Sequence, residues 1–416
     1  MSTPSSSPVA PAQTVQKDVL HLPDFQYLLA ARLCNALGGM GFATVIGYQL
    51  YTLTKDPLSL GWLGLIQVIP ALSLSLLGGH IADRGNRKLI VLTTAGSEAI
   101  CMLLLMLIAI NVQQFGGVLA IYAVVFLIGF ASGFLRPASS AFEQQVIPLE
   151  QAAKGSSWMS SIWQIGAITG GPLAGFSIDR LGIPTTYLII AILMGSALIF
   201  IGLIPRRPTP PPVEGETIWQ SLREGVKFVF ASQTLVGSMA LDLFAVLFGG
   251  AMAMLPIFAT DILHVGATGL GIMRTAPSIG ALLVMLMATR RPPTHHAGRN
   301  LLLCVAGFGV SMIVFGLSRN FTLSLVALFF SGVFDGVSMI VRDVVMRVLS
   351  PEHMRGRIAS VSWVFIGASN ELGALESGVA ARLLGTAPSV FWGGCVTMLV
   401  VGTVALTLPK LRQLRL

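Results

Sequence analysis

Long apolar runs separated by short polar segments make up most of the chain. Each run has 18 residues or more, and a helix needs about 20 mainly apolar residues to cross the hydrocarbon core of a bilayer. The pattern therefore predicts an all-α polytopic membrane protein with twelve transmembrane helices. They are expected at residues 26–52, 59–82, 89–110, 117–142, 156–178, 183–204, 233–259, 268–289, 300–317, 321–346, 358–380 and 388–408.

The segments outside these runs predict two tails and a linker. The N-terminal MSTPSSSPVAPAQ is rich in proline, serine and alanine, so residues 1–24 are expected to form a disordered tail. No basic segment leads directly into an apolar core there, so we expect no signal peptide and a retained first helix. Residues 205–232 form the linker, and residues 409–416 form a second tail.

The linker divides the chain into six-helix halves at residues 25–204 and 233–408. Its first part is rich in proline and should be extended. Its second part places four apolar residues at helical spacing, which favours an amphipathic helix at the membrane surface: Ile218, Leu222, Val226 and Val229. A simple tether between the two halves is the plainer interpretation.

The two halves share a weak internal repeat. The segment LGLIQVIP (63–70) resembles LGIMRTAP (270–277) at an offset of 207 residues. At an offset of 203, further pairs are Gly129 and Gly332, Gly133 and Gly336, Pro148 and Pro351, Lys154 and Arg357, Gly170 and Gly373, Gly175 and Gly378, and Gly182 and Gly385. Two pseudo-symmetric halves with a site between them are a transporter architecture.

Composition and charge support the membrane assignment. Hydrophobic residues make up 54% of the chain and charged residues only 11%, whereas soluble domains carry about 25% charged residues. The net charge of +8 comes from short clusters between apolar runs, so it indicates topology and not nucleic-acid binding. The four cysteines lie singly inside apolar runs, and we expect neither a disulfide nor a metal site.

Lysine and arginine are distributed unevenly between the two sets of loops. The side that holds both termini would carry Arg84, Arg87, Lys88, Lys154, Arg206, Arg207, Arg290, Arg291, Arg299, Arg355, Arg357, Lys410, Arg412 and Arg415, and the other side Lys55, Arg180, Arg319 and Arg382. Because cytoplasmic loops carry an excess of Lys and Arg, both termini are expected in the cytoplasm. The expected location is the inner (cytoplasmic) membrane, crossed many times.

The segment LLGGHIADRGNRKLIVL (76–92) gathers charges between the second and third helices. It resembles the loop motif G-x-x-x-D-R-x-G-R-R/K of the major facilitator superfamily, although Gly85 comes one place early and Asn86 takes its usual position. The helix count, the long middle loop and the duplicated halves extend this resemblance over the whole chain. It implies the twelve-helix fold of that superfamily and a transporter that works by alternating access.

The resemblance implies a cytoplasmic gate, for which the candidates are Gly79, Asp83, Arg84, Arg87, Lys88 and Glu143. Gly79 would permit close helix approach, and Asp83 would cap the N-terminus of the eleventh helix near Ile358. Arg87 would pair with Glu143 at the end of the fourth helix. In the alternative interpretation these charges only orient the chain in the membrane.

The fifth helix contains GAITGGPLAG (166–175), which resembles the G-x-x-x-G-P-x-x-G pattern of proton-coupled antiporters in that superfamily. It implies export and a hinge in this helix, formed by Gly166, Gly170, Gly171, Pro172 and Gly175. Ordinary packing of small residues is the alternative. The segments FLRPASSAFEQQVIP (134–148) and SPEHMRGRIASV (350–361) resemble the subfamily of the enterobactin exporter and the macrolide efflux proteins.

Ionisable residues inside spans are costly and usually line a cavity or pair with one another. A proton-coupled exporter needs a carboxylate that titrates differently in the two access states, and the candidates in order are Asp242, Asp335 and Glu371. A static salt bridge to Arg32, Arg136 or Arg274 is the alternative for each. The candidates for the substrate cavity are Arg32, Arg136, Phe244, Phe248 and Arg274.

These features favour a proton-coupled exporter of a small organic molecule, either a siderophore or an amphipathic drug. A facilitative uniporter or importer of a metabolite is the alternative, and a membrane-embedded enzyme is a remote one because the six histidines lie at or near loops without catalytic companions. We expect no cofactor beyond the proton gradient, no ATP-binding loop and no nucleic-acid partner. The expected partners are the substrate and the lipid bilayer, with the monomer as the functional unit.

Overall fold

The computed structural model shows a chain that is helical almost throughout the part it describes. That part comprises residues 18–208, 226–230, 232–249, 251–290, 293, 295–351 and 355–414. Residues 1–17 of the expected N-terminal tail lie outside the described residues, as do Ile218 and Leu222 of the linker. The prediction of disorder was wrong for the end of that tail, where Val19–His21 form a short helix and Pro23 begins the first long one. Within the linker, residues 226–230 are helical and Val229 is buried.

Six long helices form the N-terminal half, close to the predicted spans. They are α1 (Pro23–Thr54), α2 (Pro57–Arg84), α3 (Arg87–Ile110), α4 (Gly117–Val146), α5 (Ala152–Leu181) and α6 (Ile183–Leu203), with the short η1 (Val19–His21) and η2 (Leu149–Gln151) beside them. The start of the half is fixed to α5, because Lys154 Nζ donates to Asp18 Oδ2 at 2.5 Å. This hydrogen bond holds the pKa of Asp18 below its usual value.

The C-terminal half repeats this arrangement, except that its first crossing is interrupted. That crossing comprises α8 (Gln233–Gly249), η3 (Ala251–Met254), α9 (Leu255–Ile257) and η4 (Phe258–Ile262), and the others are α10 (Gly266–Ala288), α11 (Ala297–Leu317), α12 (Phe321–Leu349), α13 (Arg355–Leu384) and α14 (Thr386–Thr407), followed by α15 (Pro409–Arg412). The prediction of one continuous helix at 233–259 was wrong. Gly249 and Pro256 disfavour an uninterrupted α-helix there.

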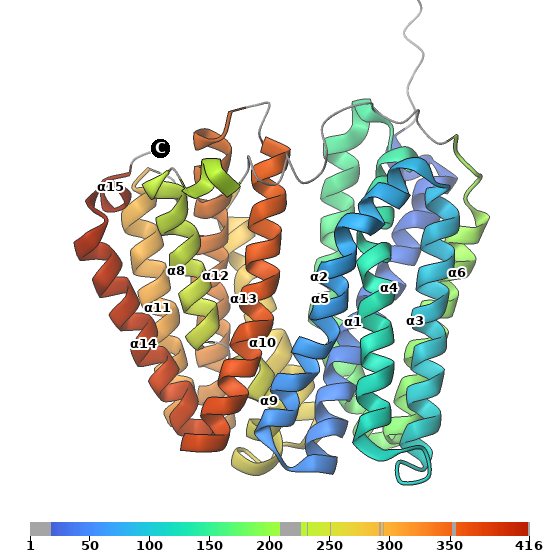
Figure 1. Cartoon of the computed structure of the whole chain (residues 1–416), viewed down its shortest axis with the longest axis horizontal. Coiled ribbons are helices and arrows are strands. Elements are labelled where there is room, and N and C mark those ends of the chain that lie inside the picture. Colours follow the sequence, from blue (N-terminus) through green and yellow to red (C-terminus); the bar gives the residue numbers. More distant parts are fainter. Residues whose placement is uncertain are drawn as a thin grey trace, which may run out of the picture.

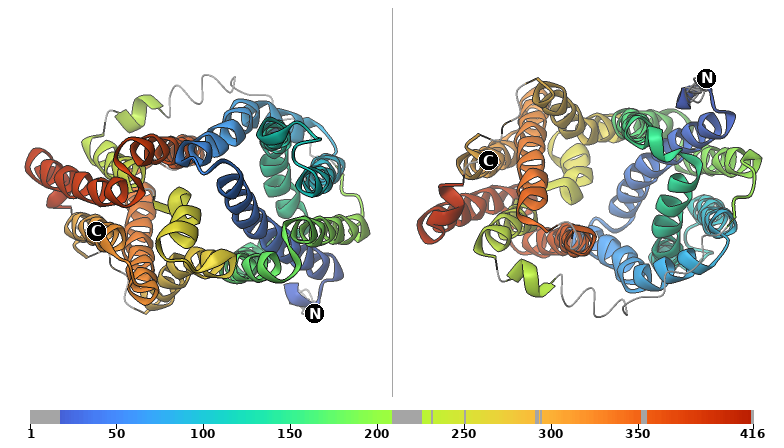
Figure 2. Two further views of the ribbon diagram at one scale, coloured as in Figure 1. Left: turned by 90° about the horizontal axis from the view of Figure 1, so that it is seen from below. Right: turned by 90° about the horizontal axis from the view of Figure 1, so that it is seen from above.

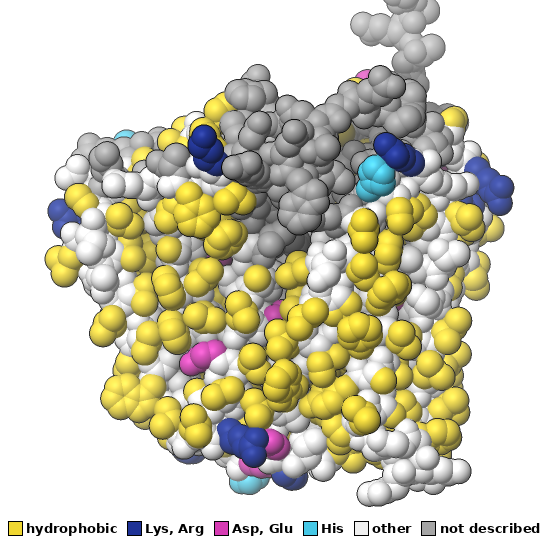
Figure 3. All heavy atoms as spheres, viewed as in Figure 1, with side chains coloured by type: hydrophobic (Ala, Val, Ile, Leu, Met, Phe, Trp, Pro, Cys, Tyr) yellow, Lys and Arg dark blue, Asp and Glu magenta, His cyan; other side chains and the backbone are white. Residues whose placement is uncertain are grey.

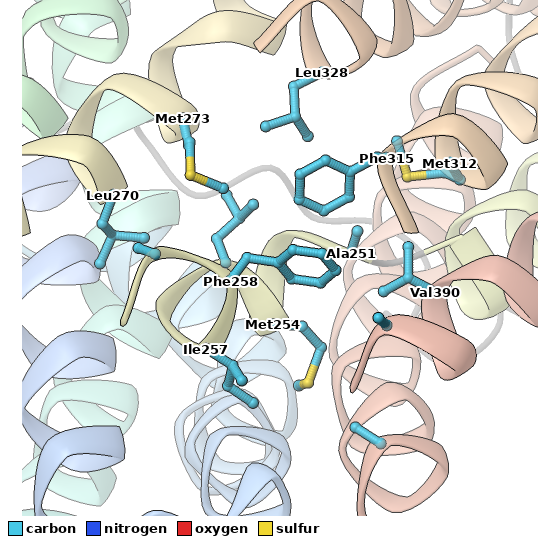
Figure 4. Packing of buried hydrophobic residues seen from close by; sticks show 14 of the residues in the cluster. Ala251, Met254, Ile257, Phe258, Leu270, Met273, Met312, Phe315, Leu328 and Val390 are labelled. Atoms are coloured by element: carbon cyan, nitrogen blue, oxygen red, sulfur yellow. The ribbon is translucent and has the colours of Figure 1, made fainter. Parts of the chain in front are cut away.

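Apolar packing stabilises the interrupted crossing. Figure 4 shows Phe258 and Phe315 next to one another, with Met254 and Met312 beside them. The two rings are tilted by 30°, and their centroids are 4.3 Å apart. Each of these side chains is almost completely buried. Burying an aromatic or methionine side chain contributes about 1.5–3 kcal/mol, so this cluster offsets part of the backbone hydrogen bonding that the irregular turns lose.

The described helices are suited to a bilayer. Ten segments are long and apolar enough to cross a membrane, which confirms the predicted all-α polytopic membrane fold. Among the long helices, α5 and α13 fall short of that apolarity because they are rich in glycine and serine. Figure 3 shows apolar side chains over the middle of the visible face and charged side chains mainly toward its two ends.

The two halves stand side by side, with the first and the last described residues at one end, called here the terminal end (Figures 1 and 2). Paired glycines repeat the same packing in the two halves. A Cβ on Gly129 of α4 would meet Pro70 of α2, and a Cβ on Gly332 of α12 would meet Pro277 of α10. Gly182 and Gly385 end α5 and α13 with φ of +86° and +90°, a region that favours glycine.

Candidate functional site

Close contacts between the halves gather at the end of the bundle opposite the termini, called here the closed end. Two helix pairs, α2 with α13 and α5 with α10, make most of them. A Cβ on Gly61 near the start of α2 would meet the backbone of Leu375 on α13 at 3.0 Å, and Gly171 of α5 lies against Gly271 of α10. In Figure 1, α2 and α13 lie side by side near the closed end and diverge toward the terminal end.

The GAITGGPLAG segment of α5 presents two glycine stripes to two different helices. Gly166 and Gly170 face Ala36 and Leu37 of α1, within the N-terminal half. Gly171 and Gly175 face α10 of the other half, where Gly175 lies against the backbone of Ala267. The pattern thus serves packing on both faces. Pro172 lies inside an α5 that continues from Ala152 to Leu181, and the hinge stays a prediction.

Asp179 joins the halves at the closed end by binding the start of a helix. The backbone N–H groups of Ala267 and Thr268 donate to its two carboxylate oxygens at 3.3 and 2.8 Å. These groups belong to the first turn of α10, whose N–H donors lack intrahelical partners and whose dipole favours an anion. The carboxylate therefore stabilises the start of α10 from across the contact between the halves.

Two ion pairs also join the halves. The Tyr51 hydroxyl donates to Asp261 Oδ2 at 2.5 Å, and Lys55 Nζ lies 3.3 Å from Asp261 Oδ1. On the α2–α13 side, Arg382 Nη1 lies 3.6 Å from Asp56 Oδ2, and Asp56 itself caps the N-terminus of α2. We call Asp179, Asp261, Asp56 and Arg382 the closed-end latch.

The sequence contains a signal for this latch that was not among the predicted gate residues. GFSIDRLG (175–182) repeats the G-x-x-x-D-R-x-G pattern of the loop motif at 79–86, and Gly182 stands where the motif has Asn86. Arg382 occupies the place equivalent to Asp179 in the second half, at the repeat offset of 203. The motif thus recurs at the opposite end of the bundle, once with the acid and once with a base.

A cavity of about 150 Å³ lies within the C-terminal half, between the closed end and the terminal end. Three helices, α8, α12 and α13, supply its lining. The lining residues are Ser238, Met239, Asp242, Val246, Asp335, Met339, Arg342, Asp343, Met346, Ser362, Phe365, Ile366, Ser369 and Asn370. The first two candidates for proton coupling, Asp242 and Asp335, therefore share one cavity.

Arg342 of α12 connects the two carboxylates. It forms an ion pair with Asp242 of α8, and their side chains are only 11% and 9% exposed. Its Nη2 lies 4.0 Å from Asp335 Oδ1, and the Asp335 side chain is 51% exposed. The partner of Asp242 is thus Arg342, not one of the three arginines considered from the sequence. In such an arrangement, a proton that binds to one carboxylate would release Arg342 to pair with the other.

Glu371, the third candidate, lies elsewhere. Its carboxylate abuts Gly64 of α2 at the contact between the halves, and it is absent from the lining of the cavity. The charge of Arg136 on α4 acts on Glu371 across that contact. Glu371 therefore belongs to the α2–α13 contact and not to the cavity.

The predicted gate at the terminal end is described only in part. The side chain of Asp83 lies outside the described residues, so its predicted cap on the eleventh helix stays a prediction. Arg87 donates to the carbonyls of Ala82 and Ala141 at 3.1 and 3.2 Å. Lys88 donates to the carbonyls of Gly202 and Ile204 at the end of α6. Arg84, the last residue of α2, is exposed.

Two details of the predicted gate require correction. Glu143 pairs with Arg32 of α1 at 3.4 Å, not with Arg87 as we expected. A Cβ on Gly79 would meet nothing within 4 Å, whereas a Cβ on Gly78 would meet the backbone of Phe134 at 2.9 Å. Close approach between α2 and α4 therefore depends on Gly78, because the helix turns Gly79 away from that contact.

The predicted cavity residues lie outside the cavity. Phe244 and Phe248 stack on one another along α8, with centroids 6.2 Å apart, but neither contributes to the lining. Arg32 packs over the Trp163 ring at 5.1 Å. Arg274 lies against Gly47 of α1, and its Nε has no hydrogen-bond partner among the described residues. In that same part of the chain, no group of three His, Cys, Asp or Glu residues could hold a metal ion.

Comparisons with known proteins agree with this geometry. The sequence matches the profile of the Major Facilitator Superfamily over residues 28–294. It is 24% identical over 396 residues to the enterobactin exporter EntS of Escherichia coli O1:K1 / APEC, and equally to that of Shigella boydii serotype 18 (strain CDC 3083-94 / BS512), with 94% of each chain covered.

Solved transporter structures share the fold at low sequence identity. A POT family transporter in complex with 5-aminolevulinic acid superposes with a TM-score of 0.74 at 13% identity, covering 93% of this chain and 96% of that one. The nucleoside transporter NupG gives 0.70 at 16%, covering 92% and 98%. An inward-facing, unoccupied bacterial homolog of the human lysosomal transporter Spinster gives 0.70 at 14%, covering 94% and 97%.

Proposed function

We propose that this chain, which belongs to the major facilitator superfamily, is a proton-coupled exporter of a small organic molecule. The observation that carries the proposal is the position of the Asp242, Arg342 and Asp335 cluster. The cluster lines a cavity that lies toward the terminal end, and the closed-end latch joins the two halves on the other side of it. The similarity to an enterobactin exporter over 94% of both chains supports the direction of transport.

The cluster suggests how a proton is coupled to the movement of the halves. Arg342 is held by Asp242 while that carboxylate is ionised. Protonation of Asp242 would remove the attraction and leave a buried guanidinium without a counter-charge, which is costly. Arg342 would then turn to Asp335, its neighbour at 4.0 Å on the same helix. Because α8 and α12 both line the cavity, this change of partner alters the packing that shapes it.

The latch would control access from the closed end in the second half of the transport cycle. When the halves close at the terminal end, the four latch contacts must break and the cavity must open through the closed end. We place both termini in the cytoplasm, following the excess of Lys and Arg at their end. The cavity then loads from the cytoplasm. One proton entering down 100 mV supplies about 2.3 kcal/mol for the return.

Proton movement in proteoliposomes tests this function. Vesicles contain the pH dye pyranine and valinomycin with potassium, and enterobactin or tetraphenylphosphonium is added outside. For a transported probe, antiport predicts an alkaline shift inside, because each probe that enters releases a proton. Asp242→Asn abolishes the shift, while Glu150→Gln, on the exposed short helix η2 between α4 and α5, retains it.

Two results would overturn the proposal. Entry of a probe that exceeds its entry into protein-free vesicles, without any proton movement, would indicate a uniporter. Entry accompanied by acidification would indicate symport and hence import under physiological gradients.

A further inference from the structure

The described end of the linker is packed against the C-terminal half. Residues 226–230, called here the linker segment, are helical and lie just before α8, and the Val229 side chain is almost completely buried. Val229 belongs to an apolar cluster that includes Leu235 of α8 and Ile358 of α13. Because burial of apolar surface is the main favourable term in packing, this cluster fixes the linker segment to the half that contains the cavity.

The described start of the linker is fixed to the other half. Arg207 Nη2 donates to Asp24 Oδ2, in the first turn of α1, at 2.6 Å. Gln145 Nε2 of α4 donates to the Pro208 carbonyl at 3.3 Å. The linker therefore packs on both halves at the terminal end, which a simple tether would not require.

Phe230, the last residue of the linker segment, contacts the wall of the cavity. Its ring lies beside that of Phe365 on α13, with centroids 6.2 Å apart and planes tilted by 55°, and Phe365 is one of the lining residues. In Figure 2 the yellow-green linker segment lies beside α8 and α13, on the side away from α12. Phe230 is therefore next to the cavity, where α8 and α13 pack together.

This aromatic contact lies between the terminal end and the carboxylates. Phe230 precedes α8, which begins at Gln233, and Asp242 lies nine residues further along that helix, about 14 Å deeper at 1.5 Å per residue. On α13, Ser369 lies one turn deeper than Phe365 and also lines the cavity. A molecule that enters here from the terminal end would reach Ser369 and Asp242 only after passing the two rings.

The contact is of a kind that can open while the fold stays intact. The Phe230 side chain is 60% exposed, so its displacement from Phe365 loses little buried area. A phenylalanine ring turns as a rigid plate about two bonds. Aromatic residues at a membrane surface commonly act as anchors, but anchoring does not require contact with a side chain that lines a cavity.

We propose that Phe230 and Phe365 form an aromatic gate on the terminal side of the cavity, and that this gate limits by size the molecules that enter. The transported molecule would pass it on the way to Asp242 and Asp335, and in that respect the inference rests on the proposed function. The gate would restrict any molecule that approaches from this side, so access can be measured without transport.

Labelling of a cysteine inside the cavity tests the gate. Ser369→Cys, at a side chain only 2% exposed, is introduced into the full chain without its native cysteines. Its reaction in detergent is followed with a small reagent, N-ethylmaleimide, and with the bulky fluorescein maleimide. Phe230→Ala should accelerate labelling by the bulky reagent about tenfold, a change in barrier of about 1.4 kcal/mol, and labelling by the small reagent much less.

Three further variants make the result specific to the gate. Leu406→Ala removes another exposed apolar side chain, on α14, and should leave both rates unchanged. Ser331→Cys, buried but absent from the described lining, should react at the same rate with and without Phe230→Ala. Phe230→Trp enlarges the ring and should slow the bulky reagent, which keeps the test informative if Phe230→Ala does not fold.

The outcomes separate this inference from the proposed function. An unchanged rate of the bulky reagent in both Phe230 variants overturns the gate. Equal acceleration of both reagents overturns it too, as does acceleration at Ser331→Cys, which would indicate a loosened fold. Labelling needs neither a transported substrate nor a proton gradient. Size-selective labelling without proton movement in the proteoliposome assay would therefore support the gate and overturn proton coupling.

Discussion

At the scale of single residues, the ion pair of Asp242 and Arg342 is the most sensitive feature of the cavity. Removing one partner of a buried pair costs about 3–5 kcal/mol because an unpaired charge stays buried. Arg342→Met should therefore lower the melting midpoint in detergent. Adding Asp242→Asn to it should raise the midpoint again, measured by fluorescence-detected size exclusion after heating. A double variant that melts below both single variants would contradict this coupling.

The sequence predicts how deep a residue lies along its span, but not which way it faces in the folded bundle. Residues of the site whose role depends on depth alone were therefore the predictable ones. Asp242 and Asp335 were found because ionisable groups deep in a span are rarely without function. The position of Phe244 was predicted wrongly for a reason visible in the sequence. Residues i and i+2 of an α-helix point in directions about 200° apart around its axis, so Phe244 faces away from Asp242. Arg342 was missed as the partner because the rotation of α12 relative to α8 is set by packing.

At the scale of elements, the glycine stripe of α5 controls how closely the halves approach. A Cβ on Gly175 would clash with the backbone of Ala267, which cannot yield as a flexible side chain would. Gly175→Ala should therefore separate α5 from α10 and increase the population with an open closed end. Gly195→Ala on α6, where a Cβ meets nothing within 4 Å, is the matched control. Spin-label distances across the closed end measure the change, and equal distances in both variants would refute it.

The latch predicts a second effect at this scale. Asp179→Asn removes the charge that the first turn of α10 attracts, so the closed end should open more often. A cysteine at Thr275, buried at the α5–α10 contact, should then react with maleimide about tenfold faster in a background without native cysteines. The neighbouring Arg180→Gln should leave that rate unchanged. An unaltered labelling rate in Asp179→Asn would show that Asp179 does not keep the α5–α10 contact closed.

The elements themselves followed well from the sequence, because span length and apolarity decide them. The crossing at 233–262 was the exception. Its composition is mainly apolar, and Gly249 and Pro256 were the signals that regular hydrogen bonding would be interrupted there. The second copy of the loop motif, GFSIDRLG, was also visible in the sequence. Its role could not be predicted, because it depends on a contact between Asp179 and α10, almost 90 residues away along the chain.

At the scale of the whole molecule, the halves are joined at the closed end and separate toward the termini. The sequence could not predict this state, because a chain that alternates between two closures must encode both with similar stability. The paired contacts of α2 with α13 and of α5 with α10 explain how this is possible. Each consists of small residues and a few polar bonds, which can form and break as a unit.

The alternation of the two halves is the central claim, and two distances measured together test it most directly. Spin labels at Gln114 and Leu383 report on the closed end, and labels at Leu149 and Gln413 report on the terminal end; all four side chains are exposed. Distance distributions are recorded by double electron–electron resonance in lipid nanodiscs, for the unmodified cavity and for the Asp242→Asn, Asp335→Asn double variant. We predict a short-distance and a long-distance population at each end. When the cavity charges are removed, the ratio of the two populations should change in opposite directions at the two ends. Ends that widen or narrow together, or a single distance that the double variant does not alter, would contradict alternating access coupled to this cavity.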